Sequence, residues 1–572
     1  MNWEKKDTCQ TVEEVVLRNT KMSKEEFESQ MKSHTIKGMD IAANMIWEAI
    51  SNNMPITVVG DYDADGVCSS AILKLMFNHL GVPVRIRLPH RFSEGYGLSE
   101  KIVDEIDSGL LITVDNGIAA VDAIRKAKEK ELKIIILDHH LLRDDGLLPD
   151  ADLVIDPSAI PGTCDFTKYC GGGLAYKLAC EIVDDPVVLS KISCFAAIAT
   201  VADVMPLIGE NKKIVIEGMK NLTKFKTRTT GLSAMMYAKN LDHYITAKDI
   251  GFSIGPMINA AGRLLDNGAE VALDIVTFDG DLKTAKEKAA ILNELNERRK
   301  EMVRVEMERA NEEIENSCLF SDNPLVLYLP GTGEGIIGIL AGKIAEKYSV
   351  PCFVFTDTEG PFVKGSGRNP SGDIHLKNLL DKISAKMKED PRTPDGIVRY
   401  GGHQGAAALT LPKDYFPVFY DASQECCPDL PEKKSSALYY DLEIEASQIP
   451  DMFQLIEKYG PFGEGNPEVV FKIKNFELVP KYFGLYTTNG TQKENISFAS
   501  RQCTARGYGL ADKFFSEGTP ANMDLVGMIQ LNTYKEASIG VEVLDLQKVE
   551  VPKAETLLAK LLAEKAKARS AV

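Results

Sequence analysis

Three aspartates at every second position follow a β-branched run near the start of the chain. Asp61, Asp63 and Asp65 come directly after Ile56–Val59, which is predicted to be a buried strand, and Val67–Leu80 has helical spacing. Carboxylates this close repel one another and raise each other's pKa unless a positive charge lies among them. A divalent metal ion is the simplest such charge, so the turn is a candidate metal site.

Two other structures share this acidic spacing, namely an EF-hand calcium loop and an ordinary acidic turn. An EF-hand loop needs a bidentate glutamate at its twelfth position. Ile72 occupies that position here, and a strand rather than a helix precedes the aspartates. The EF-hand is therefore disfavoured, and the choice between a metal site and a plain turn depends on the rest of the chain.

The elements around this turn alternate between strand and helix from Pro55 onward. Further strands are predicted at Val82–Leu88, Leu110–Val114, Leu132–Leu137 and Asp152–Ile155. This alternation predicts an α/β domain with a parallel sheet and helices on both faces. Ligands of such sheets collect beyond the carboxyl ends of the strands, so the residues that follow the strands are the candidates for a site.

Acids and imidazoles follow two more of these strands. Asp115 comes after one of them, and Asp138, His139 and His140 come after another. Each alone could cap a helix, but together they bring oxygen and nitrogen ligands to one edge of one sheet. A ligand set without cysteine suits Mn²⁺ or Mg²⁺ better than structural zinc. The carboxylates are numerous enough for two ions, which could activate water and hold a phosphoryl group.

Several motifs resemble the DHH phosphoesterase superfamily. The first three, in order, are Asp61-Tyr-Asp-Ala-Asp-Gly66, Val114-Asp-Asn-Gly117 and Asp138-His-His140, and Thr200–Leu207 is similar to the fourth. Further stretches resemble the RecJ-type branch of single-strand-specific exonucleases. They are Arg91-Phe92, Glu94-Gly-Tyr-Gly97, Gly255–Arg263, Gly335–Ile339, Gly365–Arg368, Gly401–His403 and Pro461–Pro467.

The resemblance implies roles for individual residues. It makes Asp63, Asp65, Asp115, His139 and Asp203 ligands of two Mn²⁺ or Mg²⁺ ions. Asp61 and His140 would be catalytic residues beside them, acting as a further ligand, as an orienter of a ligand or as a contact to the scissile phosphate. The substrate and its phosphates would be bound by Arg91, Asn259, Arg263, Ser366, Arg368, Gly401, Gly402 and His403. Asp156 is either an added acid at this site or a turn former, and we favour the turn.

The second half of the chain adds a helix, another α/β unit and a β-rich region. Asp281–Asn323 has neither glycine nor proline, and its apolar residues recur at helical spacing, so most of it is predicted to be one helix whose charges form a solvated face.

The glycines at 331, 333 and 335 resemble a dinucleotide turn, but no acid ends the following strand, which disfavours Rossmann binding. Short alternating strands after residue 437 suit a small β-barrel, where Tyr482, Phe483 and Tyr486 could stack on nucleic-acid bases.

The domain order implied by these patterns and by the resemblance follows the chain. It is an N-terminal helical region at 1–50, a DHH catalytic domain at 51–210, a helical region completing the catalytic lobe at 211–280, a long interdomain helix at 281–318, a DHHA1 substrate-binding domain at 319–430, an OB-fold domain at 431–550 and a C-terminal helix at 551–572.

Composition limits the class of protein. The chain has 572 residues, 44% of them hydrophobic, and a formal charge of −17, so any nucleic-acid surface must be a local basic patch on an acidic body. The N-terminus lacks the apolar core of a signal peptide, and no apolar run reaches the length of a membrane span. Eleven cysteines without a Cys-x-x-Cys pair suggest reduced thiols. We expect a cytoplasmic protein without membrane association.

The predicted function is that of the resembled family. It is a metal-dependent 5′→3′ exonuclease that hydrolyses single-stranded DNA to 5′-mononucleotides, in DNA recombination and repair. The first alternative is a DHH-family phosphodiesterase acting on short oligoribonucleotides or cyclic dinucleotides. The second is a non-catalytic DNA-replication scaffold of the same fold. The expected partner is single-stranded DNA, the resemblance adds a single-strand-binding protein and a helicase as candidates, and we expect a monomer.

Overall fold

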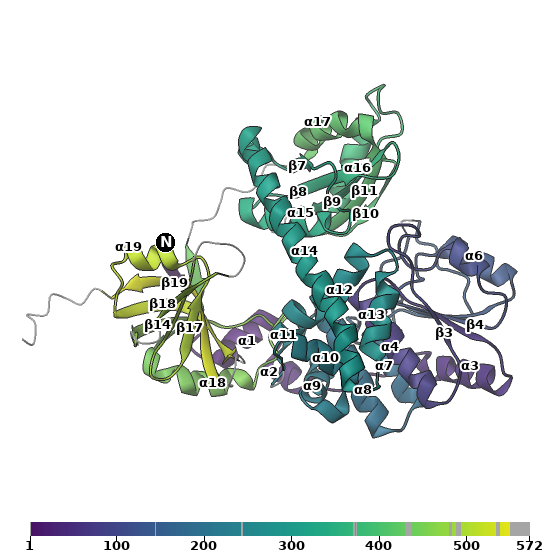
Figure 1. The fold of residues 1–572 in the computed structure, drawn as a ribbon, viewed down its shortest axis with the longest axis horizontal. Helices are drawn as coiled ribbons and strands as arrows, with labels where there is room; N and C mark the ends of the chain where they lie inside the picture. Colours follow the sequence, from purple (N-terminus) through teal and green to yellow (C-terminus); the bar gives the residue numbers. More distant parts are fainter. Residues whose placement is uncertain are drawn as a thin grey trace, which may run out of the picture. The chain divides into compact units, whose positions relative to one another are not determined.

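A computed structural model gives the fold of the chain (Figure 1). It describes residues 2–143, 145–241, 244–369, 372, 374–428, 437–479, 483–487, 494–532 and 538–549. The chain forms two compact units, the larger within Glu25–Ser435 and Gly463–Gly465 and the smaller within Met1–Lys24, Ser436–Phe462 and Asn466–Val572. The helix predicted at 551–572 and the predicted base-stacking residue Tyr482 lie outside the described residues.

The larger unit begins with a five-stranded parallel sheet. Its strand order is β3-β2-β4-β5-β6, and every neighbouring pair is parallel. The strands are β2 (Ile56–Val59), β3 (Arg85–Arg87), β4 (Leu110–Val114), β5 (Lys133–Leu137) and β6 (Leu153–Ile155). The predicted parallel sheet is therefore confirmed.

Both faces of this sheet are covered, because successive residues of a strand point to opposite sides. In β4, Ile112 packs into the core that contains α4 (Ala64–His79), while its neighbour Leu111 packs into the core with Ile124. The helices of this region are α3 (Met39–Ser51), α5 (Glu100–Asp104), α6 (Val121–Glu129), α7 (Gly171–Ile182) and α8 (Pro186–Ala202). Helix α4 contacts α7 and α8 closely, so the chain after the acidic turn is buried on several sides.

A group of helices follows the first sheet and leads into one long helix. The group comprises α9 (Gly209–Leu222), α10 (Thr230–Ala238), α11 (Ala247–Asp249), the π-helix η2 (Ile250–Ile254), α12 (Gly255–Leu264) and α13 (Gly268–Thr277). The long helix α14 (Leu282–Asn316) has 35 residues, or about 52 Å at the usual rise, and Asp281 caps its start. Figure 1 shows α14 running past α10, α12 and α13, and its far end contacts α15.

A second α/β region occupies the rest of the larger unit. Its sheet has the order β10-β11-β9-β8-β7, in which only β7 and β8 are parallel. The strands are β7 (Leu325–Tyr328), β8 (Cys352–Asp357), β9 (Phe362–Arg368), β10 (Arg399–Gly402) and β11 (Ala406–Pro412). The helices are α15 (Ile337–Tyr348), α16 (Leu376–Met387) and α17 (Phe416–Cys426).

The smaller unit is an antiparallel-rich sheet with the order β13-β14-β18-β19-β17-β16-β15. The strands are β13 (Leu442–Glu445), β14 (Val470–Glu477), β15 (Gly484–Tyr486), β16 (Asn495–Ala499), β17 (Thr504–Gly507), β18 (Asn522–Asn532) and β19 (Ser538–Lys548). Within the described residues, β13 pairs only with β14 and β15 only with β16, so the barrel expected from the sequence is not closed. Helices α18 (Ile449–Glu457) and α19 (Ala511–Ser516) accompany this sheet.

The first residues of the chain belong to the smaller unit and include a strand that the sequence did not indicate. Strand β1 (Trp3–Lys5) pairs in parallel with β12 (Leu438–Tyr440), and α1 (Val12–Thr20) and α2 (Lys24–Ser29) follow it. Because β1 is short and its partner lies more than 400 residues away, local periodicity gave no sign of it.

Two expectations from composition can be compared with the structure. All eleven cysteines are free thiols, in agreement with the predicted reduced state. Over the part of the chain that the structure describes, no helix is both long and apolar enough to serve as a membrane span.

The attachment of the first residues to the smaller sheet gives a stability prediction. Arg18 on α1 donates hydrogen bonds to Asp7 and, at 2.5 Å, to the carboxylate of Asp441, whose side chain is only 5% exposed. Replacing Arg18 by Ala leaves that buried charge without its cation, so we expect the smaller unit to lose about 1–3 kcal/mol of unfolding free energy. Urea unfolding followed by Trp3 fluorescence in a Trp47→Phe background measures it.

Lys24→Ala is the matched control, because Lys24 pairs with Glu13 on the surface, where both side chains are well exposed. It should change the same free energy by less than about 0.5 kcal/mol. If the Arg18→Ala and Lys24→Ala proteins unfold at the same urea concentration, the Arg18–Asp441 pair does not stabilise the unit.

Candidate metal centre

The acidic turn after β2 is fixed by its own backbone. Asp63 caps α4, because its Oδ1 accepts hydrogen bonds from the backbone N–H groups of Asp65 at 2.9 Å and Gly66 at 3.1 Å. A Cβ atom on Gly66 would lie 2.5 Å from the backbone oxygen of Asp61, so only glycine fits there. The three carboxylates are therefore held on one tight turn between strand and helix.

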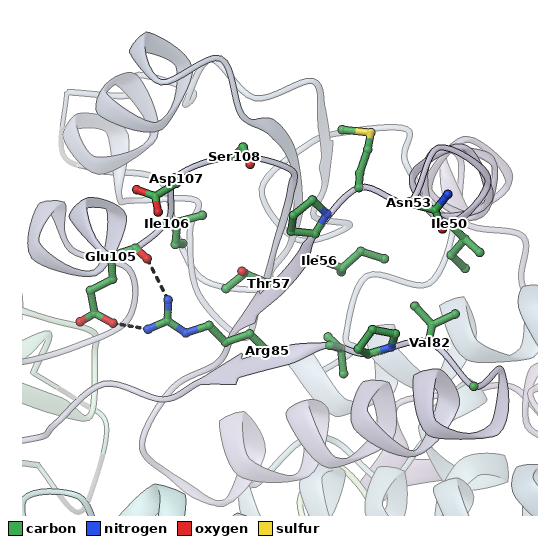
Figure 2. A pocket seen from close by; sticks show the side chains of 15 residues that line it. Ile50, Asn53, Ile56, Thr57, Val82, Arg85, Glu105, Ile106, Asp107 and Ser108 are labelled. Atoms are coloured by element: carbon green, nitrogen blue, oxygen red, sulfur yellow. Dashed lines mark hydrogen bonds and ion pairs between the residues drawn. The ribbon is translucent and has the colours of Figure 1, made fainter.

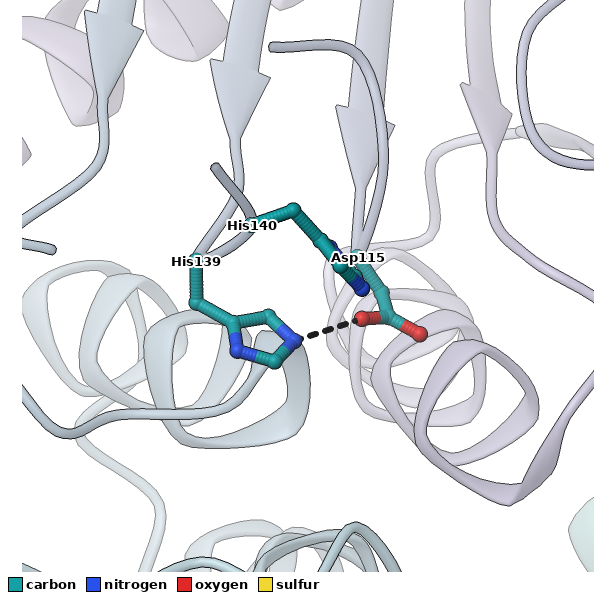
Figure 3. Close-up of side chains that lie close together, drawn as sticks. All are labelled: Asp115, His139 and His140. Carbon is teal, nitrogen blue, oxygen red and sulfur yellow. Dashed lines mark hydrogen bonds and ion pairs between the residues drawn. The ribbon is translucent and has the colours of Figure 1, made fainter. Parts of the chain in front are cut away.

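Residues from separate strand ends meet beside this turn. The Nε2 atom of His139, after β5, lies 3.1 Å from Asp115 Oδ1, 3.6 Å from Asp65 Oδ2 and 3.7 Å from Asp203 Oδ2. Figure 3 shows His139 and His140 on one side of Asp115, with the contact between His139 and Asp115 marked. The structure thus brings together acids and imidazoles that the sequence spreads over about 140 positions.

These side chains form ligand sets suitable for divalent cations. Three sets each place one ligand atom per residue within 4.8 Å of the others. They are Asp61 with Asp63 and Asp115, Asp65 with His139 and Asp203, and Asp115 with His139 and His140. The first two sets share no residue, so the donors suffice for two ions. The third set contains Asp115 from the first set and His139 from the second. Oxygen and nitrogen donors of this kind match Mn²⁺ and Mg²⁺.

Asp65 is oriented by the start of helix α7. Its Oδ2 accepts from the N–H of Gly171 at 2.8 Å, and its Oδ1 accepts from the N–H of Gly172 at 2.7 Å. A Cβ atom on Gly171 would lie 2.5 Å from the Cβ of Asp115. The glycines therefore let a helix terminus approach two acids closely, and the positive end of that helix stabilises Asp65 in its ionised form.

Burial and mutual repulsion raise the pKa of most of these acids. Burial, and then the charge of Asp63, raises the pKa of Asp65 to about 6 and that of Asp61 well above its usual value. Burial, and then the charge of Asp65, raises the pKa of Asp203 to about 8 and also raises that of Asp115. This crowding of buried negative charge is unfavourable alone and is relieved by cations, so the residues fit a metal site.

The two adjacent histidines differ in charge. Burial, and then repulsion from His140, lowers the pKa of His139 to about 3, so His139 is a neutral imidazole able to bind a metal. Burial alone would lower the pKa of His140, but the 2.7 Å hydrogen bond with Asp138 and the negative charges of Asp138, Asp203 and Asp65 together outweigh burial and raise that pKa to about 9. His140 is therefore a cation at neutral pH, within reach of Asp115 and His139.

Sequence reasoning missed some residues of this centre. Asp138 orients His140 and accepts the N–H of Ile118, and the Tyr96 hydroxyl donates to the backbone oxygen of Asp115 and lies 3.1 Å from the His140 ring. Asp138 and Tyr96 both belong to motifs quoted above, so the motifs could have indicated that these two residues lie at the site. Asp156 accepts the N–H groups of Ser158 and Ala159 and belongs to none of the three ligand sets, in line with a turn former.

Helix α12 places predicted substrate-binding residues next to the acidic turn. Asn259 accepts the N–H of Ala64 at 2.9 Å, so its side chain positions the turn itself. Arg263, at the end of the same helix, donates to the backbone oxygen of Gly335 at 3.0 Å. The guanidinium of Arg91 lies 4.4 Å above the ring of Tyr62, which is part of the acidic turn. All three therefore lie beside the metal centre.

Strand β9 supplies the other predicted phosphate contacts. Arg368 donates to the Ser366 hydroxyl at 3.3 Å and to the backbone oxygen of Gly367 at 2.8 Å. A Cβ atom on Gly338 would lie 3.0 Å from the Arg368 guanidinium, so glycine at the start of α15 leaves room for that group. Burial, and then repulsion from nearby arginines that include Arg91 and Arg368, lowers the pKa of Arg263.

The turn after β10 also lies near the metal centre. His403 donates its N–H to Ala406 at 2.8 Å, which closes the turn that begins at Gly401 and Gly402. Burial, and then repulsion from His140, lowers the pKa of His403. His403 is therefore close enough to His140 to be affected by its charge.

The predicted base-stacking residues of the smaller unit are only partly available. Phe483 stacks on Phe514, with ring centroids 4.9 Å apart, and Tyr486 contacts the edge of Tyr508. One face of Phe483 is therefore covered by its own unit. A role for these residues in binding bases remains a prediction.

A pocket at the opposite edge of the first sheet is separate from the metal centre. It has a volume of about 790 Å³ and lies at the amino ends of β2 and β3 (Figure 2). Arg85 in its wall is already paired, since it donates to both the backbone and the carboxylate of Glu105. The acids and imidazoles described above lie at the carboxyl ends of the strands, so this pocket is not part of their site.

Comparisons with known proteins agree with this arrangement. The chain matches the N-terminal domain of the DHH family at residues 55–200, the DHHA1 domain at 321–428 and the RecJ OB domain at 440–543. It is 32% identical to the single-stranded-DNA-specific exonuclease RecJ of Salmonella typhimurium over 462 residues, which cover 76% of this chain and 78% of that protein. The Thermus thermophilus protein of the same name is 30% identical over 92% of this chain and 73% of its own length.

Solved structures give the same relationship. The crystal structure of an exonuclease RecJ bound to manganese is 29% identical, with a TM-score of 0.58, and the match covers 70% of this chain and 96% of that one. The fold also matches RecJ from Thermus thermophilus in complex with Mn²⁺, with a TM-score of 0.73 and 24% identity over 94% of this chain and 76% of that one.

The crowded acids give a prediction about metal binding. Saturating Mn²⁺ should raise the unfolding temperature of the wild-type protein by several degrees, because a cation that binds only the folded state stabilises it by about 2.7 kcal/mol at 100 times its Kd. Asp115→Asn removes the acid common to two ligand sets and should abolish most of that increase. The metal-free variant should be at least as stable as the metal-free wild type, because repulsion is reduced. Differential scanning calorimetry with and without Mn²⁺ measures both effects.

Asp107→Asn is the matched control, since Asp107 is exposed at the opposite edge of the same sheet. It should respond to Mn²⁺ as the wild type does. An Asp115→Asn protein with the full Mn²⁺ response would place the metal elsewhere.

Proposed function

The chain belongs to the RecJ family of single-stranded-DNA-specific exonucleases, and we propose that it is a metal-dependent exonuclease that hydrolyses single-stranded DNA from the 5′ end to 5′-mononucleotides. One observation carries the proposal. Asp65, Asp115, His139 and Asp203 lie close together, and several arginines lie beside them. Phosphodiester hydrolysis needs both parts, one to hold divalent ions and one to hold phosphate.

The ligand sets assign the metal-holding roles. Asp61, Asp63 and Asp115 would hold one ion, and Asp65, His139 and Asp203 would hold the other. Divalent ions bound there would supply positive charge that lowers the pKa of a water molecule and stabilises charge on the phosphate. The protein keeps these ligands in place through the backbone N–H groups of α7 and the capped start of α4.

His140 is proposed as a catalytic contact to the scissile phosphate. Its ring is held by Asp138 on one side and by the Tyr96 hydroxyl on another, and it stands next to the acids. A protonated imidazole in that position can donate a hydrogen bond to a phosphate oxygen and offset its charge.

The arginines are proposed to determine which linkage is cut. Arg91, Arg263 and Arg368, with Ser366, would hold the 5′-terminal phosphate, while the metal centre acts on the next linkage. An arginine can bind a phosphate through two parallel hydrogen bonds, which fixes both distance and direction. Holding the end of the strand at a set distance from the ions explains removal of one nucleotide at a time.

The alternatives are less well supported. A non-catalytic scaffold does not require the complete set of buried acids and imidazoles found here. A phosphodiesterase for short substrates does not require the additional sheet of the smaller unit, and the relatives reported above are all named for single-stranded DNA. Action in the cytoplasm as a monomer, a role in recombination and repair, and contact with a single-strand-binding protein or helicase are parts of the proposal that rest on the resemblance.

Substitution of Asp65 tests the catalytic assignment. Asp65→Ala should abolish nuclease activity in Mn²⁺, because it removes a buried ligand, and should leave single-strand binding in EDTA largely intact. Because Asp65 also accepts two backbone N–H groups, Asp65→Asn is the second variant, since its amide oxygen keeps one of them. Release of nucleotides from a labelled single strand measures activity, and fluorescence anisotropy measures binding. Cleavage at the wild-type rate by a folded variant refutes the assignment.

The proposed end recognition predicts a substrate preference. A single strand carrying a 5′-phosphate should be degraded faster than the same strand with a 5′-hydroxyl, and the 5′-terminal label should be released first as a mononucleotide. A blunt duplex should resist, because the cut requires an unpaired end. Time courses with 5′- and 3′-labelled strands distinguish the directions, and first release of the 3′ label contradicts the proposal.

A further inference from the structure

The long helix α14 carries three polar residues on one side, at a point where it passes α12. Asn293, Asn296 and Arg299 are spaced by three residues, so they lie close together on the helix surface. Asn296 is only 1% exposed, and its Oδ1 accepts a hydrogen bond from the Arg299 guanidinium at 3.0 Å. The side of the helix that looked solvated in the sequence is therefore partly buried here.

Several polar atoms of this group are buried without a partner. The Nε of Arg299, the Nδ2 of Asn296 and the Oδ1 of Asn293 make no hydrogen bond within the described residues. Buried donors are nearly always paired in native proteins, and an unpaired one calls for an acceptor from outside the chain. Two of the three atoms are donors, and one belongs to a cation, so the group favours an acceptor that carries negative charge.

Arg299 belongs to a larger group of cations. Its charge acts on Arg263, together with the charges of Arg91 and Arg368, and burial followed by this repulsion lowers the pKa of Arg263 to about 10. Among the described residues, none of these four arginines forms an ion pair with a carboxylate. Four guanidinium groups gathered without a direct carboxylate partner repel one another and complement a polyanion.

The contacts of α14 place the helical turns that follow Arg299 beside the loop at 330–335. A Cβ atom on Gly333 would lie 3.5 Å from Met302, and Glu306 accepts the hydroxyl of Thr332 at 2.6 Å. The same loop continues to Gly335, whose oxygen accepts from Arg263. Helix α14, the loop at 330–335 and the end of α12 thus meet around the guanidinium groups.

We propose that Arg299, held by Asn296, binds a phosphate group of the DNA strand and is the fourth arginine of the group that contains Arg91, Arg263 and Arg368. The inference rests on the proposed function for the identity of the anion, but its binding role does not require the metal ions. Arg299 is thus a substrate-binding residue on the helix that joins the two α/β regions.

The test compares variants in EDTA, by fluorescence anisotropy with a 5′-phosphorylated oligothymidylate. Arg299→Met should weaken binding about tenfold and reduce the slope of log Kd against log salt concentration by about 0.7, the value for one fewer phosphate contact on a single strand. Arg298→Met, on the exposed side of the same helical turn, should change neither quantity. Arg299→Lys should retain the slope, because it retains the charge, with a smaller loss of affinity.

A second variant keeps the test informative if Arg299→Met does not fold. Asn296→Asp places a carboxylate against Arg299 and neutralises its charge without removing the side chain, so it should reduce the salt slope by the same amount. Wild-type affinity and slope in either folded variant overturn the inference. Hydrolysis by the wild-type protein in Mn²⁺ is measured separately, so absence of nuclease activity refutes the proposed function while the binding data still decide the role of Arg299.

Discussion

The constraint on which this structure depends is the repulsion among carboxylates buried at one edge of a parallel sheet. Asp61, Asp65 and Asp115 are each at most 2% exposed, and each stands directly after a strand or at a helix start. The fold tolerates them because backbone N–H groups donate hydrogen bonds to the carboxylates, as Gly171 and Gly172 do to Asp65. The negative charge that these hydrogen bonds do not offset attracts divalent cations.

A group of arginines from both halves of the larger unit lies beside this negative centre. Arg91 and Arg263 come from the first α/β region and its helices, Arg299 from α14 and Arg368 from β9. Substrate phosphates can neutralise the arginines, and divalent cations can neutralise the acids. A single strand of DNA bound together with the cations therefore offsets both groups of charge. In the proposed function, the separation of the two groups of charge, rather than the net charge of the acidic chain, determines where the strand binds and where it is cut.

The sequence predicted that acids and imidazoles meet at one sheet edge, because most of these residues follow strands. Asp115 and His139 were expected at one sheet edge because parallel strands end together, and the structure places them 3.1 Å apart. Arg299 and Asn296 could not be found in this way, because helical periodicity assigns such positions to a solvated face and cannot show that α12 covers them. Strand β1 and the open end of the smaller sheet were missed because both depend on pairing between distant segments.

Anomalous X-ray diffraction from crystals grown with Mn²⁺ tests the central claim most directly. The account predicts two anomalous peaks within bonding distance of the ligand sets, one among Asp61, Asp63 and Asp115 and one among Asp65, His139 and Asp203. An occupied manganese site elsewhere, with these six side chains free of metal, would contradict it.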